Sequence, residues 1–126
     1  MNKISNAENE PVNHEIVEEV KTNMLPTGHL SRAVSFFKAI GDETRMKILY
    51  ALSQYEMCVN DIAAVLDMSK SAVSHQLKLL KMEGQVKNRR DGKNIYYALD
   101  DQHVVHVLAE TLEHVKHKMN DEQPDD

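Results

Sequence analysis

Apolar residues recur at intervals of three and four positions along most of this 126-residue chain, a pattern typical of helices with one buried face. Pro26, Gly28 and Gly41 interrupt the pattern, while Asp42 and Ser69 are suitable residues for capping the start of a helix. The spacing predicts helices over residues 14–24, 29–40, 43–53, 60–66, 70–80 and 101–119. The chain is therefore expected to be mainly α-helical.

Residues 85–99 follow a different pattern, in which β-prone residues replace the helical spacing. Two such runs, 86–90 and 95–99, flank the sequence Asp91-Gly92-Lys93-Asn94. An Asp-Gly pair between two β-prone runs is a strong signal for a β-hairpin. The expected fold class is therefore α+β, mainly helical with one small β-hairpin.

The helices expected over 60–66 and 70–80 are separated by three residues, which is the outline of a helix-turn-helix. In that motif the second helix lies in the major groove of DNA. A basic hairpin directly after it makes the motif a winged helix-turn-helix, whose wing touches the DNA backbone or the minor groove. Double-stranded DNA is thus the expected partner.

The distribution of charge supports this partner, although the net charge of the chain is −5. Residues 69–99 carry a net charge of +5, whereas residues 1–28, 29–68 and 100–126 carry −3, −1 and −6. A polyanion responds to the local field, so the basic segment is the candidate contact surface. Short hydroxyls and an imidazole suit base edges, and lysine and arginine suit phosphates. The candidate DNA-contacting residues are Ser69, Lys70, Ser71, Ser74, His75, Lys78, Arg89, Arg90 and Lys93. The alternative is an ordinary solvated helix face.

Length and composition predict one domain, over residues 14–119, between a disordered arm at 1–13 and a disordered acidic tail at 120–126. The chain is 41% hydrophobic, enough for a modest core that a dimer interface would enlarge. The single cysteine, Cys58, excludes an internal disulfide and suits a reducing cytosol. No signal peptide and no run of about 18 apolar residues is visible, so the expected location is cytoplasmic.

The last predicted helix, 101–119, carries four of the seven histidines of the chain. At about 100° per residue, His103, Glu110, His114 and His117 fall within about 60° of one another, opposite an apolar face. Along the axis, however, His103 and His114 are separated by roughly 16 Å, too far for bonds of about 2 Å to one metal ion. Two antiparallel copies of the helix would bring the start of one beside the end of the other. The spacing therefore predicts a homodimer with two intersubunit metal sites, against the alternative of a solvated histidine stripe.

The sequence SAVSHQLKLLK, the wing RRDGK and the pair Tyr96-Tyr97 resemble the ArsR/SmtB family of metal-sensing winged helix-turn-helix repressors. The similarity covers residues 29–117, and the motifs occur in the order that the family has. The resemblance implies a homodimer that binds operator DNA when free of metal. Metal binding would release the DNA and turn on genes for metal efflux or sequestration.

The resemblance also implies a ligand set, because Asp-x-His followed by His-x-x-His resembles the C-terminal helix site of this family. It places Asp101 and His103 of one subunit with His114 and His117 of the other. Three imidazoles and one carboxylate favour zinc, also suit cobalt or nickel, and disfavour selectivity for thiophilic metals. His106 lies outside the ligand spacing and is expected to be a solvent-facing or outer residue.

Some members of the family have a second metal site, which joins the region before the helix-turn-helix to the N-terminal arm. Cys58 and Asp61 match part of it, and His14 could supply a further ligand. Asn60, however, stands where thiol-rich members have a second cysteine, and the arm of this chain has none. We expect this second site to be weak or vestigial. The alternative is that Cys58 is simply a small, partly buried side chain.

These features leave three candidate functions. The leading hypothesis is a zinc-responsive transcriptional repressor, and the first alternative is an ArsR-type repressor that senses a non-metal or thiol-site signal. A remote alternative is a small zinc enzyme. Catalytic zinc sites keep one coordination position open, whereas this ligand set already supplies four protein groups. The sequence also has no HExxH motif, no Ser-His-Asp set and no phosphate-binding glycine loop, so we predict that the protein is not an enzyme.

Overall fold

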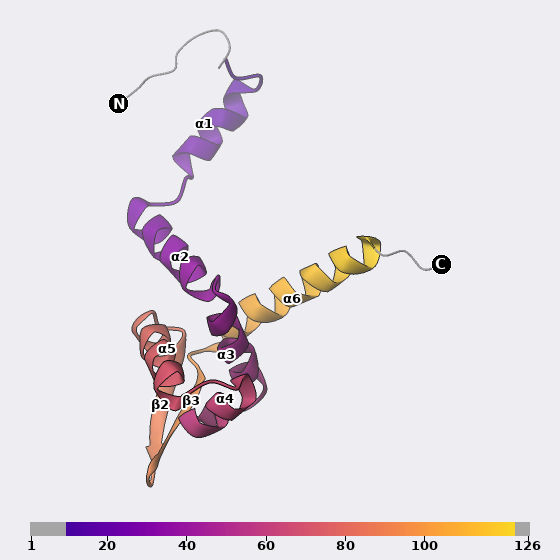
Figure 1. Cartoon of the computed structure of the whole chain (residues 1–126). Helices are drawn as coiled ribbons and strands as arrows, with labels where there is room; N and C mark the ends of the chain where they lie inside the picture. The colour runs from indigo at the N-terminus through magenta and orange to yellow at the C-terminus, as the bar shows by residue number, and fades with distance from the viewer. Residues whose placement is uncertain (1–9, 123–126) are drawn as a thin grey trace. The chain divides into compact units, whose positions relative to one another are not determined.

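The computed structural model describes residues 10–122 of the chain. The outer parts of the predicted arm and tail, residues 1–9 and 123–126, lie outside the described residues. The chain divides into two compact units, with the boundary between Val34 and Ser35. Figure 1 gives the order of the elements along the chain.

The first unit contains helix α1 (His14–Thr22) and the beginning of α2 (Thr27–Ile40). Asn13 caps α1, since its side-chain oxygen accepts the N–H of Ile16 at 3.0 Å. Within its own unit α1 has no buried residue, and its apolar side chains Ile16 and Val20 are 55% and 50% exposed. The apolar face that the sequence predicts for this helix is therefore present, and within the first unit it is exposed.

The second unit contains the rest of α2 and the other helices, which are α3 (Glu43–Gln54), α4 (Val59–Leu66), α5 (Lys70–Met82) and α6 (Gln102–Glu122). The two predicted caps are confirmed: Asp42 accepts the N–H of Arg45 at 3.0 Å, and Ser69 accepts that of Ala72 at 3.1 Å. Asp67 adopts a left-handed conformation, with φ of 56°, in the turn that joins α4 to α5. α6 continues past the predicted end at residue 119, so residues 120–122 are helical.

A three-stranded antiparallel sheet, in the order β1-β3-β2, combines one strand that precedes α4 with two strands that follow α5. The hairpin of β2 (Val86–Asp91) and β3 (Asn94–Leu99) is confirmed, and Gly92, with φ of 64°, provides the left-handed residue that its turn requires. The edge strand β1 (Met57–Cys58) was not predicted, because two residues are too few to show a strand pattern. β1 pairs with β3 through Met57 opposite Tyr97 and Cys58 opposite Tyr96.

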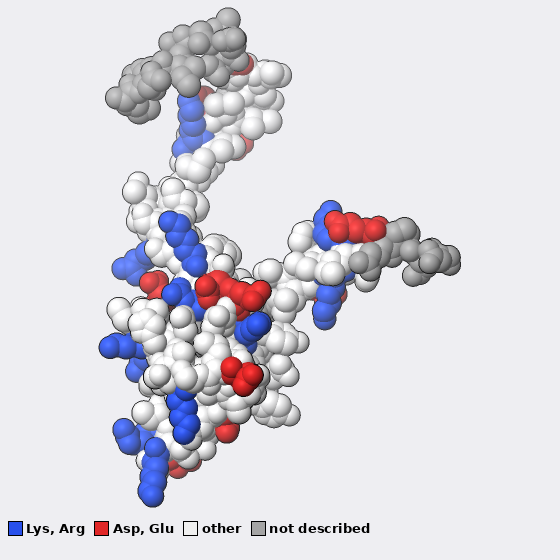
Figure 2. Space-filling view, viewed as in Figure 1, with Lys and Arg blue, Asp and Glu red and all other residues white. Residues whose placement is uncertain are grey.

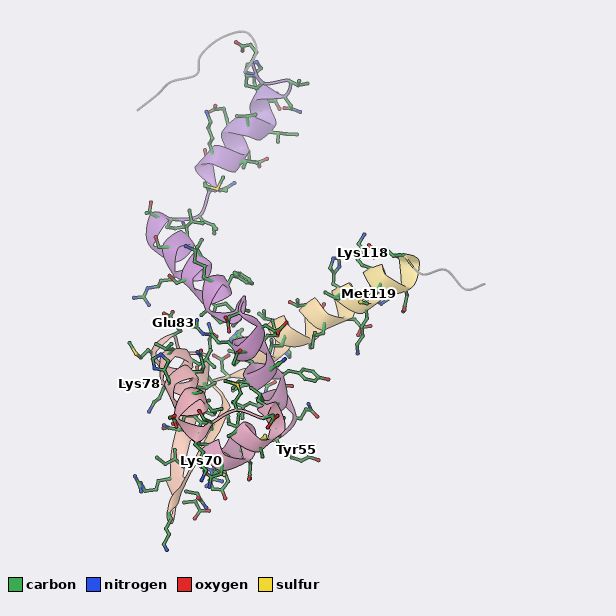
Figure 3. The ribbon with its side chains drawn as sticks, viewed as in Figure 1. Tyr55, Lys70, Lys78, Glu83, Lys118 and Met119 are labelled. Atoms are coloured by element: carbon green, nitrogen blue, oxygen red, sulfur yellow. The ribbon has the colours of Figure 1, made fainter. Side chains whose placement is uncertain are left out.

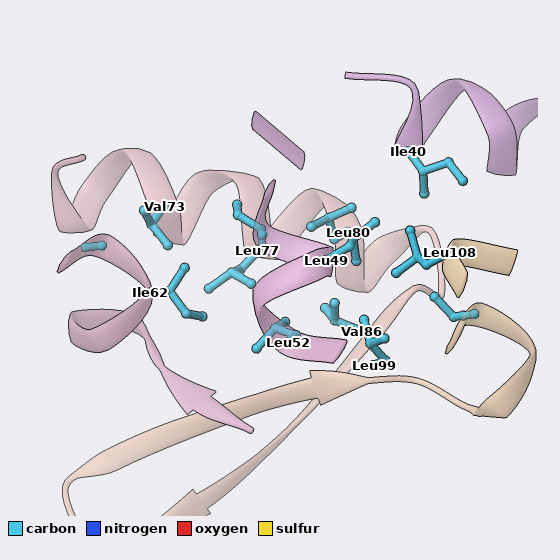
Figure 4. Packing of buried hydrophobic residues seen from close by; sticks show 13 residues of the cluster. Ile40, Leu49, Leu52, Ile62, Val73, Leu77, Leu80, Val86, Leu99 and Leu108 are labelled. Atoms are coloured by element: carbon cyan, nitrogen blue, oxygen red, sulfur yellow. The ribbon is translucent and has the colours of Figure 1, made fainter. Parts of the chain in front are cut away.

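The core of the second unit lies between α3, α4, α5 and the base of the hairpin (Figure 4). The recognition candidate α5 contributes Val73, Leu77 and Leu80, all of them fully buried. The first turns of α6 close one end of this core with Val104 and Leu108, which are 4% and 2% exposed. The same core therefore holds both α5 and the beginning of the histidine-bearing helix. The α+β winged helix-turn-helix fold predicted from the sequence is confirmed.

The segment after α5 also connects these elements by hydrogen bonds. Gln85 is completely buried, and its backbone N–H donates to the carbonyl of Leu80 in α5 at 3.0 Å. Its backbone carbonyl accepts the N–H of Asp100 at 3.0 Å, just before α6. Its side chain donates to the carbonyl of Phe36 in α2 at 3.1 Å. Over residues 10–122, no helix combines the length and the apolar character needed to cross a membrane.

Candidate functional site

One face of α5 is exposed in the way that the sequence predicts. Val73, Leu77 and Leu80 point into the core, so the helical repeat leaves a polar face toward solvent. All the predicted contact residues on and just before this helix are exposed: Ser69, Lys70, Ser71, Ser74, His75 and Lys78. Figure 3 labels Lys70 and Lys78, one near each end of this face. The first turn of α5 has no acidic residue, so the positive end of its dipole is available to an anion.

The position of α5 is fixed by polar contacts that the sequence analysis did not identify. Arg45 of α3 donates from Nε to the side-chain oxygen of Gln76 at 2.9 Å, and from Nη1 to the carbonyl of Ala39 at 3.4 Å. At the other end of α5, Lys81 donates to the side-chain oxygen of Asn88 in β2 at 3.0 Å. Helix and wing are thus joined directly, and they present their polar faces as one unit. Arg45 and Gln76 lie 31 residues apart, so no local sequence pattern indicates their contact.

The tip of the wing is basic, and Figure 2 shows lysine and arginine side chains gathered at the end of the hairpin. Arg90 and Lys93 are exposed there, as predicted. Arg89 is also half exposed, but its guanidinium is paired: Nη2 lies 2.6 Å from Oε1 of Glu56, and Nε lies 3.0 and 3.1 Å from the two oxygens of that carboxylate. Sequence reasoning missed Glu56, because its place beside the wing depends on the unpredicted strand β1.

This ion pair changes the titration of both partners. The hydrogen bond from Arg89 holds the pKa of Glu56 below its ordinary value. The same hydrogen bond raises the pKa of Arg89 above its ordinary value, and the nearby Asp91 carboxylate acts in the same direction from 3.8 Å. Both groups are therefore charged throughout the neutral range. Arg89 also lies over the ring of Tyr96, 5.0 Å from its centroid.

The start of α6 brings two of the predicted metal ligands together. Oδ1 of Asp101 accepts the backbone N–H of His103 at 2.9 Å and that of Val104 at 3.2 Å, so this carboxylate caps the helix. Nδ1 of His103 lies 3.6 Å from the same oxygen, and the imidazole is 94% exposed. The hydrogen bond from Val104, followed by that from His103, lowers the pKa of Asp101. Asp101 is therefore an anchored anion at the first turn of α6.

The other two predicted ligands, His114 and His117, lie on the later turns of α6 and are exposed. Nε2 of His117 lies 3.4 Å from a carboxylate oxygen of Glu113 on the same helix. Within residues 10–122 of one chain, no three His, Cys, Asp or Glu side chains are grouped closely enough to hold a metal ion. The pair at the start of α6 and the pair near its end are thus separate in the protomer. His106 is also exposed.

The residues of the predicted second site lie at the beginnings of two helices, α4 and α1. Cys58 is buried at the start of α4, where its side chain makes no capping hydrogen bond, and Asp61 is exposed in the first turn of that helix. Cys58 also lines a shallow cavity together with Asn60 and Lys93. His14 begins α1 in the first unit, with Nε2 3.8 Å from a carboxylate oxygen of Glu10.

Comparison with known proteins matches residues 42–88, which span α3 to the middle of β2, to the family described as bacterial regulatory protein, arsR family. A transcriptional repressor SmtB homolog from Synechocystis sp. is 38% identical over 108 residues, which cover 85% of this chain and 82% of that protein. A cadmium resistance transcriptional regulatory protein CadC homolog from Staphylococcus aureus is 46% identical over 79 residues, 62% of this chain and 65% of that protein.

Solved structures show the same architecture. The antimony-specific transcriptional repressor AntR superposes with a TM-score of 0.70 at 30% identity, over 77% of this chain and 88% of that chain. A homodimeric winged helix-turn-helix DNA-binding domain from Mycobacterium bovis, described as a possible ArsR-family transcriptional regulator, gives a TM-score of 0.71 at 28% identity. That match covers 74% of this chain and 86% of the other.

Proposed function

The chain belongs to the arsR family of bacterial regulatory proteins, and we propose that it is a zinc-responsive transcriptional repressor. In this proposal a metal-free homodimer binds operator DNA, and zinc at α6 releases it. The observation that carries the proposal is that α6 has a buried beginning and exposed histidines. Its first turns, through Val104 and Leu108, are buried in the core that holds the DNA-reading candidate α5, while its histidines remain exposed. A ligand bound at this helix therefore acts on an element that shares its core with α5.

The DNA interface consists of the exposed face of α5 together with the basic tip of the wing. Ser74 and His75 lie on α5 with small or polar side chains that suit base edges in the major groove. Lys70 and Lys78 flank them and suit phosphates, as do Arg90 and Lys93 on the wing. The hydrogen bond from Lys81 to Asn88 links the two parts of the interface directly.

A homodimer would cover apolar surface that each unit, taken by itself, leaves exposed. In the first unit, Ile16, Val20 and Leu30 are 47–55% exposed, and on the later turns of α6, Val115 and Met119 are 44% and 52% exposed. Exposed apolar residues at helical spacing are typical of an interface between chains. Two-fold symmetry makes an isologous contact, in which each chain offers the same surface to the other.

Zinc is the metal we propose, held by Asp101 and His103 of one subunit and by His114 and His117 of the other. Three imidazoles and a carboxylate form a closed tetrahedral set for zinc, and cobalt or nickel are the competing ions. Equilibrium zinc binding at neutral pH tests the proposal, with two tight sites per dimer expected. A dimer that lacks tight zinc but still binds DNA would point to a repressor that senses another signal, with idle histidines.

Substitutions in the two parts of the DNA interface are expected to act differently. For these tests, the operator is the tightest duplex selected from a random-sequence library. Arg90→Ala should weaken binding to operator and random duplex alike. Because a phosphate contact is lost, the slope of log K against log salt should become shallower by about one. Ser74→Ala or His75→Ala should weaken binding to the operator more than to random duplex. Fluorescence anisotropy over a salt series measures both quantities.

The contrast between the two duplexes is the critical readout. If Arg90→Ala and His75→Ala change the affinities for operator and random duplex by equal factors, the assignment of base reading to α5 and phosphate contact to the wing is wrong. Lys116→Ala, on the exposed part of α6, removes one positive charge outside the proposed interface and serves as the matched control.

Zinc affinity is expected to fall as the pH drops below about 6.5, where free imidazole takes up a proton, because imidazole binds metal only when it is neutral. Asp101 does not cause this loss, since its hydrogen bonds keep its pKa below the ordinary value for aspartate. Release of operator DNA by zinc should disappear over the same pH range. Competition against a chelator, corrected for the protonation of the chelator itself, measures the trend. Constant zinc affinity between about pH 5 and 7.5 would contradict a histidine-dominated site.

A further inference from the structure

Arg89 differs from the other basic residues of the wing, because a carboxylate from outside the hairpin already occupies its guanidinium. The guanidinium donates from both Nε and Nη2 to the carboxylate of Glu56, with three nitrogen to oxygen distances between 2.6 and 3.1 Å. This is the geometry with which arginine also binds a phosphate. Glu56 therefore occupies the atoms that a DNA phosphate would need.

The register of the sheet creates this contact. Arg89 of β2 lies opposite Tyr96 of β3, and Tyr96 lies opposite Cys58 of β1, so these three side chains share one face of the sheet. Glu56 directly precedes β1, on the far side of β3 from Arg89. The guanidinium crosses the Tyr96 ring at 5.0 Å to reach it. The Tyr96 ring thus packs against the Arg89 guanidinium, and the Glu56 carboxylate pairs with its nitrogens.

Both partners remain accessible to solvent. The side chain of Arg89 is 53% exposed and that of Glu56 is 37% exposed. Exposed ion pairs contribute little to folding, because water screens the charges. A phosphate that approaches the wing can therefore take the place of the carboxylate without unfolding the hairpin.

We propose that Glu56 is an internal substitute for a DNA phosphate, which Arg89 must exchange for a backbone phosphate when the wing binds a duplex. Glu56 is then a residue that sets the affinity for DNA of any sequence and its dependence on salt. The inference rests on the proposed contact between wing and DNA, and adds a residue that is acidic and lies outside the basic segment.

The exchange has a defined effect on counterions. When a free arginine binds a phosphate, the DNA releases close to one cation. The Arg89–Glu56 pair is neutral as a whole and presents less positive charge to DNA than a free arginine does, so the net release for this contact is less than one cation. Removing the charge of Glu56 should restore the release, and the slope of log K against log salt should then steepen by up to about 0.9.

The test uses Glu56→Gln, which keeps the size and the hydrogen-bonding oxygen of the side chain but removes its charge. Binding to a random-sequence duplex, measured with the full-length apo dimer between about 50 and 200 mM salt, should tighten up to about fivefold at the lower salt, with the steeper slope. Operator binding should tighten by the same factor. In an Arg89→Gln background, Glu56→Gln should change neither affinity nor slope.

A matched control separates this exchange from a general loss of negative charge. Glu43→Gln also removes one acidic charge from a pair with a basic residue, since Glu43 lies 3.8 Å from Lys47 on α3, and it should leave the slope unchanged. Equal effects of Glu43→Gln and Glu56→Gln would overturn the inference. So would unchanged or weaker DNA binding by Glu56→Gln, which would mean that the carboxylate positions the wing rather than competing with DNA.

The same experiment distinguishes failure of this inference from failure of the proposed function. If Arg90→Ala also leaves DNA binding unchanged, the wing does not contact DNA and the proposed interface is wrong. If Arg90→Ala weakens binding while Glu56→Gln has no effect, only the exchange at Arg89 is wrong. Thermal unfolding of each variant establishes that the hairpin is intact, because loss of an exposed pair should shift the transition little.

Discussion

A mixed dimer of two differently disabled chains is expected to bind one zinc ion tightly, whereas neither parent homodimer does. One chain carries Asp101→Ala with His103→Ala, and the other carries His114→Ala with His117→Ala. Each homodimer retains only half of every site. In the mixed dimer, the intact start of α6 from the second chain meets the intact end of α6 from the first, so one site is complete and the other has lost all four ligands.

The structure supports this expected stoichiometry, because the two halves of the proposed ligand set are separate within a protomer. Asp101 and His103 lie at the first turn of α6, whereas His114 and His117 lie on its later turns. Chelator competition on the purified mixed dimer, tagged differently on each chain, gives the stoichiometry. A mixed dimer without a tight site would show that the ligands are not shared between subunits.

Asp101 needs its own control, since it caps α6 as well as being a proposed ligand. Asp101→Ser keeps an oxygen for the N–H groups at the helix start but supplies no carboxylate for zinc. It should retain the helix content of the wild type and still lose tight zinc. His106→Ala is the matched control on the same helix, because it removes an exposed imidazole outside the ligand spacing and should leave zinc binding intact.

The helices of this protein could be predicted from the sequence because each signal is local. Asp42 and Ser69 begin helices that their own side chains cap, and Gly92 lies at the turn of the hairpin. The outward face of α5 also follows from the spacing of Val73, Leu77 and Leu80. These features depend on residues within a turn or two of each other, so periodicity and capping preferences are sufficient.

The contacts that the sequence did not reveal are those between distant segments. Glu56 and Arg89 are 33 residues apart, and only the pairing of β1 with β3 brings them together. The cap that Asp101 provides does have a local signal, because an aspartate just before an apolar helical pattern is a typical capping residue. The buried connection of Gln85 to α2, α5 and the start of α6 had no signal, since glutamine is ordinarily exposed.

Zinc is expected to weaken operator binding by the wild-type dimer on the order of 5- to 150-fold, the usual range of coupling between two sites. The path for this effect is short. Asp101 follows Asp100, whose N–H donates to Gln85, and Gln85 in turn donates to Leu80 of α5. Val104 and Leu108 of α6 share a core with Leu77 of α5. In the proposed mechanism, zinc that fixes two α6 helices against each other therefore acts on α5 of both subunits.

The spacing of the two recognition helices determines how this acts on DNA. They must fit successive major grooves about 34 Å apart, so a small rotation of one subunit against the other is sufficient to weaken docking. The variant His114→Ala with His117→Ala should bind operator as the wild type does without zinc, and added zinc should not release it. Release of DNA from that variant at the same zinc concentration would place the sensing site elsewhere.

The coupling between zinc and DNA is tested most directly by measuring zinc affinity with and without saturating operator, at fixed salt and pH. Linkage requires that operator weaken zinc binding by the same factor by which zinc weakens operator binding. We therefore expect the zinc dissociation constant of the operator-bound dimer to be higher than that of the free dimer by this factor. An equal zinc affinity in the presence and absence of operator would contradict a zinc-responsive repressor.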